Sequence, residues 1–260
     1  MIELPKSWNE ISIQTYLDIL DFYKIYKDTE YDILEFNIEL ISIITNIDID
    51  GDEINSLTID DITNIINQLS FINQPPSTKF LVDITPEFKF KTFEALTLGE
   101  FIDIEFFFAN NYIDNLTNIL TILYRKYKVG DWNQIIFEPY DVIDYTTRKN
   151  EFLDIPIGYV YGILNAYLQF RKEFMERYSL IFEPEIEEDE DEVVDPRILQ
   201  MMAENNEEKN ELEEKIQQKW SWEAMIYQLA NNDIIKVNEI TDLGLIFVFN
   251  MLALRKEMSL

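Results

Sequence analysis

Four short stretches of the chain share one pattern of apolar and polar positions. Each has an apolar residue, a middle residue, a second apolar residue, and then apolar positions at helical spacing. The stretches are ISIQTYLDI from Ile11, LTIDDITNI from Leu57, LTLGEFIDI from Leu96, and the looser DIPIGYVYGIL from Asp154. Their middle residues, Ser12, Thr58, Thr97 and Pro156, are types that suit a helix start. We therefore predict that a helix begins at each stretch.

The order of these stretches predicts an internal repeat. Apolar helical patterns follow the first and third stretches, as ILEFNIELISIITNI and YIDNLTNILTILYRKYKVG. We predict a pseudo-repeat of three-helix units over residues 7–74 and 93–178. The alternative is that any isoleucine-rich helical chain contains such similarities by chance.

Two segments predict a minor β component. Prolines at 75, 76 and 86 disfavour helix between the halves. There, FLVDI and FKFKTF alternate like strands and could pair as a hairpin. A second strand–turn–strand segment is predicted around Glu138–Pro139. The expected fold is mainly α: a helical body, residues 1–182, of two related three-helix halves with minor β-hairpins, and a tethered C-terminal helical module.

The sequence after residue 182 divides into three predicted parts. Residues 183–196 form an acidic linker, residues 197–219 a charged helix, and residues 220–260 a helical docking module with two short helices. Two short helices cannot bury both of their apolar faces alone, so they must pack on the body, on a second copy or on a partner. The candidate partner-binding residues are Trp220, Trp222, Met225, Ile226, Leu229, Phe247 and Phe249.

Composition excludes several kinds of chemistry. The 260 residues include no Cys and no His, which excludes disulfides, thiolate metal sites and His-based catalytic triads. There is no glycine-rich phosphate loop, and DIDGDE from Asp48 lacks the spacing of a calcium loop. Carboxylate pairs such as Asp60–Asp61 and Asp103–Glu105 are expected in a chain with 50 acidic residues. We expect no enzymatic activity, no cofactor and no metal.

The formal net charge of −29 restricts the partners. Direct nucleic-acid binding and binding to an anionic membrane are disfavoured, because both need a cationic surface. The acidic tether contains Glu187, Glu188, Asp189, Glu190, Asp191 and Glu192. It could be a solubilising linker, a mimic of nucleic-acid phosphates that occupies a basic site on another protein, or a screen that covers an aggregation-prone partner until assembly.

Several stretches resemble a known group of proteins. LPKSWNEISIQTYLDI, LTLGEFIDIEFFF, LYRKYKVGDWNQIIFEPYD and FLDIPIGYVYGILNAYLQF resemble structural-module proteins of crAss-like phages that infect Bacteroidetes. WSWEAMIYQLANNDIIKVNEITDLGLIFVFNML is similar in plan to the distal part of long-form tail assembly chaperones. In that family, a tethered helical module engages the tape-measure protein.

The resemblance implies a non-enzymatic phage assembly or structural protein, either a tail assembly chaperone or a virion component. The implied partners are other phage structural proteins (tape measure, tail or portal-associated), and we expect a homo-oligomer. The expected location is the host cytoplasm during assembly, or the virion. The alternative hypothesis is an acidic DNA mimic that inhibits a host or phage DNA-binding protein.

Overall fold

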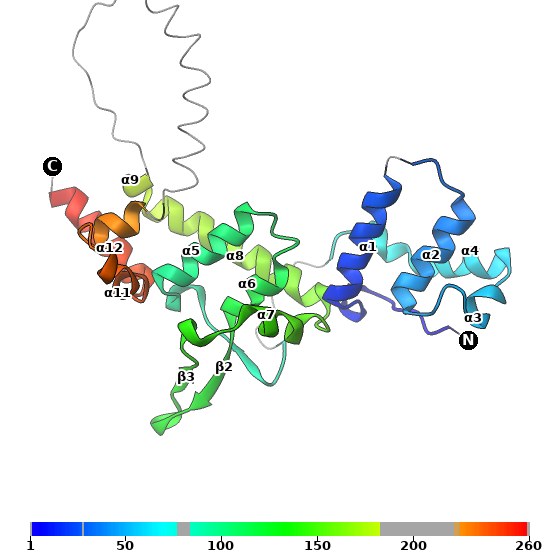
Figure 1. Ribbon diagram of the computed structural model, residues 1–260, viewed down its shortest axis with the longest axis horizontal. Helices are drawn as coiled ribbons and strands as arrows, with labels where there is room; N and C mark the ends of the chain where they lie inside the picture. Colours follow the sequence, from blue (N-terminus) through cyan, green and yellow to red (C-terminus); the bar gives the residue numbers. More distant parts are fainter. Residues whose placement is uncertain (1, 28, 77–83, 183–221, 223, 259–260) are drawn as a thin grey trace, which may run out of the picture. The chain divides into compact units, whose positions relative to one another are not determined.

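The computed structural model describes residues 2–27, 29–76, 84–182, 222 and 224–258. In this part of the chain the fold is mainly α with a small three-stranded antiparallel sheet, as predicted (Figure 1). Contacts divide the chain into two compact units. Unit 1 combines Met1–Phe93 with Ile104–Glu173, and unit 2 combines Glu94–Asp103 with Phe174–Leu260.

The first part of unit 1 is a small helical cluster. Its elements are η1 (Trp8–Glu10), α1 (Ile13–Tyr26), α2 (Ile33–Thr45), α3 (Asp52–Asn55), α4 (Ile59–Gln68) and η2 (Ser70–Asn73). Helix α2 packs against both α1 and α4 (Figure 1). An aromatic contact at 4.8 Å between Phe22 and Phe36 joins α1 to α2, and the Tyr26 hydroxyl donates to Glu39 at 2.6 Å.

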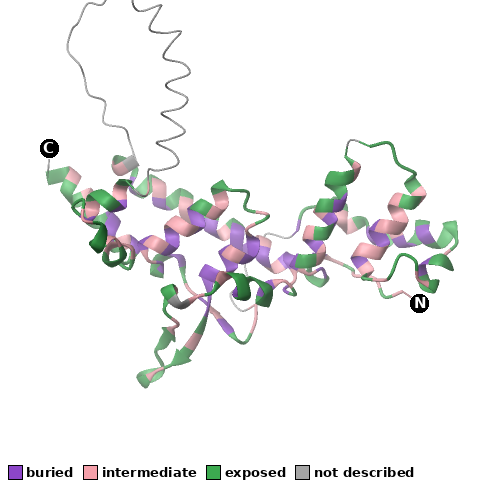
Figure 2. Cartoon of the chain, viewed as in Figure 1, coloured by how far each residue is buried: buried purple, intermediate pink, exposed green. Residues whose placement is uncertain are grey.

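The second part of unit 1 contains the sheet. Its elements are β1 (Phe88–Phe90), η3 (Phe93–Ala95, shared with unit 2), α6 (Leu116–Leu123), β2 (Tyr124–Val129), η4 (Asp131–Asn133), β3 (Ile135–Phe137), η5 (Tyr140–Val142), α7 (Tyr145–Arg148) and η6 (Lys149–Phe152). Strand β2 lies in the centre, with Lys89 opposite Arg125 and Lys128 opposite Ile136. In Figure 2, β2 changes from buried where it leaves α6 to exposed towards its far end.

Two local predictions in this region were wrong. The helix predicted over YIDNLTNILTILYRKYKVG ends at Leu123, and the following six residues form β2. The strands turn at Gly130–Gln134 rather than at Glu138–Pro139. The reason is tertiary pairing: YRKYKV obtains hydrogen-bonded neighbours on both sides, which outweighs its helix propensity.

Unit 2 is helical in the part that the structure describes. It contains the start of α5 (Leu98–Ala109), the end of α8 (Ile157–Arg177), α9 (Ser179–Phe182), helical residues 224–229, η7 (Ile234–Lys236), α11 (Val237–Thr241) and α12 (Leu245–Met258). Helices α5 and α8 each contribute residues to both units. These units differ from the expected domains, because residues 94–103 and 174–182 of the predicted body group with the C-terminal residues.

All four predicted helix starts are present, and three of them take part in backbone pairing. In unit 1, Ser12 bridges Pro156, so that the starts of α1 and α8 lie antiparallel. The Ile13 N–H donates to the Ile155 carbonyl at 2.9 Å, and the Ile157 N–H donates to the Ile11 carbonyl at 2.8 Å. We call this arrangement a start pair.

Unit 2 contains a second start pair. Thr97 bridges Gly244, which joins the starts of α5 and α12. The Leu98 N–H donates to the Leu243 carbonyl at 2.8 Å, and the Leu245 N–H donates to the Leu96 carbonyl at 2.9 Å. The hydrogen-bond pattern is the same as in unit 1.

Candidate interaction surfaces

An aromatic cluster lies beside the start pair of unit 2 and includes two predicted partner-binding residues, Trp222 and Phe249. The ring of Trp222 lies 5.5 Å from Phe101 and 6.4 Å from Phe249. Phe174 lies 4.7 Å from Phe249, and the Tyr178 hydroxyl donates to the Asn250 side chain at 2.8 Å. The C-terminal residues therefore pack on the start of α5 and the end of α8 within one unit.

This packing divides the described partner-binding candidates into three groups by exposure. Ile226 and Phe249 are buried, and Trp222, Met225 and Leu229 are partly exposed. Phe247 is 57% exposed. Trp220 and the six acidic residues of the predicted tether lie outside the described residues. Of the predicted set, Phe247 is therefore the described residue that is most available to a partner.

Phe247 belongs to a longer exposed stripe on α12. The stripe consists of Phe247, Met251, Leu254 and Met258, of which the last three are 50%, 47% and 78% exposed. Their spacing of four, three and four residues places all four on one face of the helix. We call this set the α12 stripe. The sequence analysis missed Met251, Leu254 and Met258, although their helical spacing from Phe247 could have identified them.

A second exposed apolar feature is the tip of the β2–β3 hairpin in unit 1. Trp132 is completely exposed, and Val129 and Ile136 are 60% and 46% exposed. Trp132 and Asn133 both have positive φ, of 62° and 59°. Tight hairpin turns require such values and normally place Gly, Asn or Asp there, so Trp132 occupies an unfavourable position for its type. The sequence analysis did not identify this residue.

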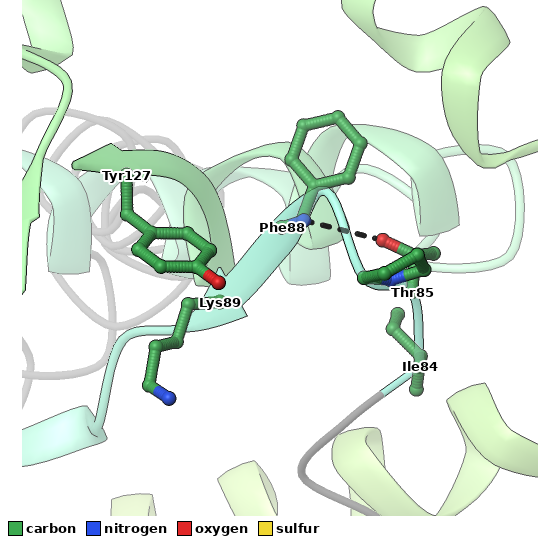
Figure 3. A pocket seen from close by; sticks show the side chains of 6 residues that line it. Ile84, Thr85, Phe88, Lys89 and Tyr127 are labelled. Atoms are coloured by element: carbon green, nitrogen blue, oxygen red, sulfur yellow. Dashed lines mark hydrogen bonds between the residues drawn. The ribbon is translucent and has the colours of Figure 1, made fainter. Parts of the chain in front are cut away.

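Two hollows lie in unit 1. The first has a volume of about 350 Å3, and Figure 3 shows side chains that line it, with the hydrogen bond from the Phe88 N–H to the Thr85 hydroxyl. This hydrogen bond is 3.3 Å long, and the Lys89 ammonium group lies 5.8 Å from the centre of the Tyr127 ring. The second, of about 450 Å3, is lined by Leu20, Tyr23, Lys24, Lys27, Asn111 and Ile113. Neither lining contains a carboxylate beside a nucleophile, so neither has the arrangement used in general-base catalysis.

In the sheet region, the Glu138 carboxylate is bound by arginine side chains and by a backbone N–H group. Arg148 donates two hydrogen bonds to the Glu138 carboxylate, at 2.5 and 3.0 Å, and the Lys126 N–H donates a third at 3.0 Å. Burial raises the pKa of Glu138, but these hydrogen bonds and the charges of Arg148 and Arg125 together hold it below its usual value. Glu138 therefore stays ionised and joins the sheet to α7.

A second carboxylate is engaged inside unit 1. Glu105 is 7% exposed, accepts from the Tyr167 hydroxyl at 2.8 Å, and accepts from Arg171 Nε at 2.8 Å on each oxygen. Burial, together with the neighbouring Glu105 charge, raises the pKa of Tyr167 well above its usual value. Among the described residues, no group of three or more acidic side chains could hold a metal ion.

No family model matches the sequence, and no curated protein or solved structure resembles it significantly. In the described part of the chain, none of the helices has the length and apolar content needed to cross a membrane.

Proposed function

We propose that the chain is a non-enzymatic phage assembly or structural protein that acts through protein–protein contacts, as a tail assembly chaperone or a virion component. The observation that carries this proposal is the α12 stripe. Four large apolar side chains on one helix face are exposed next to a well-packed aromatic cluster. Exposed apolar faces of this kind mark sites where a partner helix or groove is bound.

The position of the stripe supports a binding role over a role in the core of unit 2. Helix α12 already buries Leu245, Val248 and Phe249 on its inner face. The α12 stripe is thus a second apolar face on a helix that is already anchored. An anchored helix loses little conformational entropy when a partner covers its free face, which favours binding.

The engagement of the Glu105 and Glu138 carboxylates supports the same proposal. The Glu105 carboxylate is buried and the Glu138 carboxylate is partly exposed, and both are bound by Tyr167 or by arginine side chains, as expected for groups that stabilise the fold. We propose tape-measure, tail or portal-associated proteins as partners, a homo-oligomeric state, and a location in the host cytoplasm during assembly or in the virion.

Quantitative mass spectrometry of purified phage particles and of infected-cell lysate tests this function. A fixed ratio to the portal protein in particles indicates a virion component. Abundance in the lysate together with absence from particles indicates a chaperone. If the protein is absent from particles and its lysate partners are DNA-binding proteins that compete with DNA for it, the assembly proposal is wrong and the DNA-mimic alternative is favoured.

A pair of variants tests the surface itself. We expect Phe247→Glu with Met251→Glu to reduce recovery of tail or portal proteins at least about tenfold, because each charge would have to be desolvated in the contact. The matched control is Ile25→Glu, which changes an isoleucine of α1 that is 67% exposed. Equal recovery with both variants would show that the α12 stripe is not the contact.

A further inference from the structure

Among the helices of eight or more residues in the described part of the chain, five begin with an aliphatic–X–aliphatic sequence, and four of these five form the two start pairs. The fifth is Leu57–Thr58–Ile59 at the start of α4. Among the described residues, this segment bridges no other. The helix start of α4 therefore has the sequence of a start-pair member, but no second helix start pairs with it in the described part of the chain.

Exposure separates the fifth segment from the others. The second apolar residue is completely buried in all four paired starts, namely Ile13, Leu98, Ile157 and Leu245. The equivalent residue of α4, Ile59, is 69% exposed. This position is thus buried wherever the start is paired, and we expect a paired segment to bury Ile59 as well.

The backbone of the fifth segment has the conformation that pairing requires. Thr58 has φ −80° and ψ 164°, close to the φ −69° and ψ 160° of the paired Ser12. Within the described part of the chain, the Ile59 N–H and the Leu57 carbonyl make no hydrogen bond. In the start pairs, the equivalent N–H and carbonyl groups are the ones that bond to the other start.

The cap of α4 is compatible with pairing as well. Thr58 and Asp61 form a capping box, in which the Thr58 N–H donates to the Asp61 carboxylate at 3.0 Å. Thr97 and Glu100 form the same kind of box, at 2.8 Å, while Thr97 is bridged to Gly244. A capping box therefore leaves room for the second start.

The start pairs also specify the sequence of the missing complement. One member of each pair has glycine two positions after its bridge residue. A Cβ at Gly158 would lie 3.1 Å from the Trp8 carbonyl carbon, and one at Gly99 would lie 3.1 Å from the Thr241 Cβ. Because glycine has no side chain, it leaves space for the residues that precede the other helix start of the pair. Helix α4 has Asp60 at this position, so its complement must supply the glycine.

We propose that Leu57–Ile59 is a docking edge for a partner protein, and that the partner contributes a helix start of the form apolar–X–apolar–Gly. This chain's own starts of that form, LTLG at 96–99 and IPIG at 155–158, already pair internally. The docking edge lies in unit 1, whereas the α12 stripe lies in unit 2. The two proposals therefore fail or succeed separately.

A disulfide trap tests the edge, because the chain has no cysteine. The probe is a synthetic peptide of residues 94–105 that carries Thr97→Cys, added to the full chain that carries Thr58→Cys in a glutathione redox buffer. Bridge residues in this type of antiparallel pair are non-hydrogen-bonded neighbours, whose Cα atoms come close enough for a disulfide. The matched control chain carries Asp32→Cys, which also removes an N-cap, at α2, beside the 64% exposed Ile33.

We expect at least about tenfold more mixed disulfide with the Thr58→Cys chain than with the control chain. Gly99→Val in the peptide, or Ile59→Lys in the chain, should reduce the yield to the control level. Equal yields for the two chains, or a yield that is unchanged by Gly99→Val, would overturn the proposal. Preferential disulfide-linked homodimers of the Thr58→Cys chain would overturn it too, since the occupant would then be a second copy.

Discussion

The two start pairs use the same backbone hydrogen bonds and fill the space behind them differently. In unit 1, four residues after Ser12 and five after Pro156, the side chains are Tyr16 and Tyr161, whose hydroxyls lie 3.0 Å apart. The equivalent positions in unit 2 are Phe101 and Phe249. These two phenylalanines meet through Phe174 and Trp222, without a polar contact between them.

This difference shows that the backbone pairing of the helix starts and the packing of side chains behind it depend on different residues. The backbone pairing depends on the apolar–X–apolar pattern and on one glycine in each pair, because these features allow two chain segments to approach closely. The following residues decide whether the aromatic side chains also share a hydrogen bond, as Tyr16 and Tyr161 do in unit 1, or make ring contacts alone, as Phe174 and Phe249 do in unit 2. In unit 1, Ile163 of α8, seven residues after Pro156, is buried, whereas the equivalent residue of α12, Met251, seven residues after Gly244, is 50% exposed. The second pair therefore leaves an apolar face free.

The largest effect should come from the aromatic interior of unit 2. Phe249→Ala should destabilise unit 2 by about 4 kcal/mol, because it removes a completely buried ring and leaves a cavity. Phe247→Ala, two residues earlier, should change stability by less than about 0.5 kcal/mol, since this ring is 57% exposed. Urea unfolding with hydrogen exchange as the local readout checks both variants. Similar losses for the two would mean that the α12 stripe is part of the core.

A smaller effect should come from Gly158, the glycine of the start pair in unit 1. A Cβ at Gly158 would lie 2.1 Å from the Asn9 side-chain oxygen and 3.1 Å from the Trp8 backbone. Gly158→Ala should cost about 1–2 kcal/mol, because overpacking exceeds the gain of up to about 1 kcal/mol in helix propensity. Gly99→Ala should cost less, since its nearest contact is the Thr241 side chain at 3.1 Å. The unfolding free energies of both variants check this order, which a stabilising Gly158→Ala would contradict.

The helix starts could be predicted from the sequence because their signals are local. Ser12 and Thr58 each accept a hydrogen bond from the N–H three residues later, as expected for N-caps. The mainly α fold, which the structure confirms, could be predicted from the same local signals. The pairing of the starts could not be predicted, because Ser12 and Pro156 are distant in sequence and local patterns do not specify partners. One signal was available: LGLIFVFNML from Leu243 resembles IPIGYVYGIL from Ile155, position by position.

Which apolar residues of the C-terminal segment are exposed could be predicted only in part, for a similar reason. The sequence shows that residues 220–260 contain many apolar side chains, but it does not show which of them are covered by α5 and α8. Phe249 was assigned to a partner and is buried, whereas Met251 and Leu254 were not assigned and are exposed. The strand β2 was missed because its strand conformation depends on neighbours on both sides. Trp132 was missed because a positive φ at tryptophan has no sequence signal.

The smallest effect should come from making the interior of unit 1 resemble that of unit 2. Tyr16→Phe with Tyr161→Phe removes one hydrogen bond and should cost about 1 kcal/mol or less at neutral pH. Burial raises the pKa of Tyr16 and raises that of Tyr161 to about 12. A tyrosine in the unfolded chain has a pKa of about 10. The folded protein therefore holds the hydroxyl protons of Tyr16 and Tyr161 more tightly than the unfolded chain does. Their contribution to stability is complete below about pH 10 and is lost as the pH rises towards 12.

The double variant should therefore lose less stability than the wild type between about pH 10 and 12, and the two unfolding curves should converge or cross in this range. Urea unfolding at a series of pH values measures this difference, with Tyr227→Phe, at a 46% exposed tyrosine of unit 2, as the control substitution. A pH dependence that is the same in the wild type and the double variant would show that the two hydroxyls do not couple to folding. The hydrogen bond between Tyr16 and Tyr161 would then distinguish the two start pairs in composition, without linking tyrosine ionisation to the stability of unit 1.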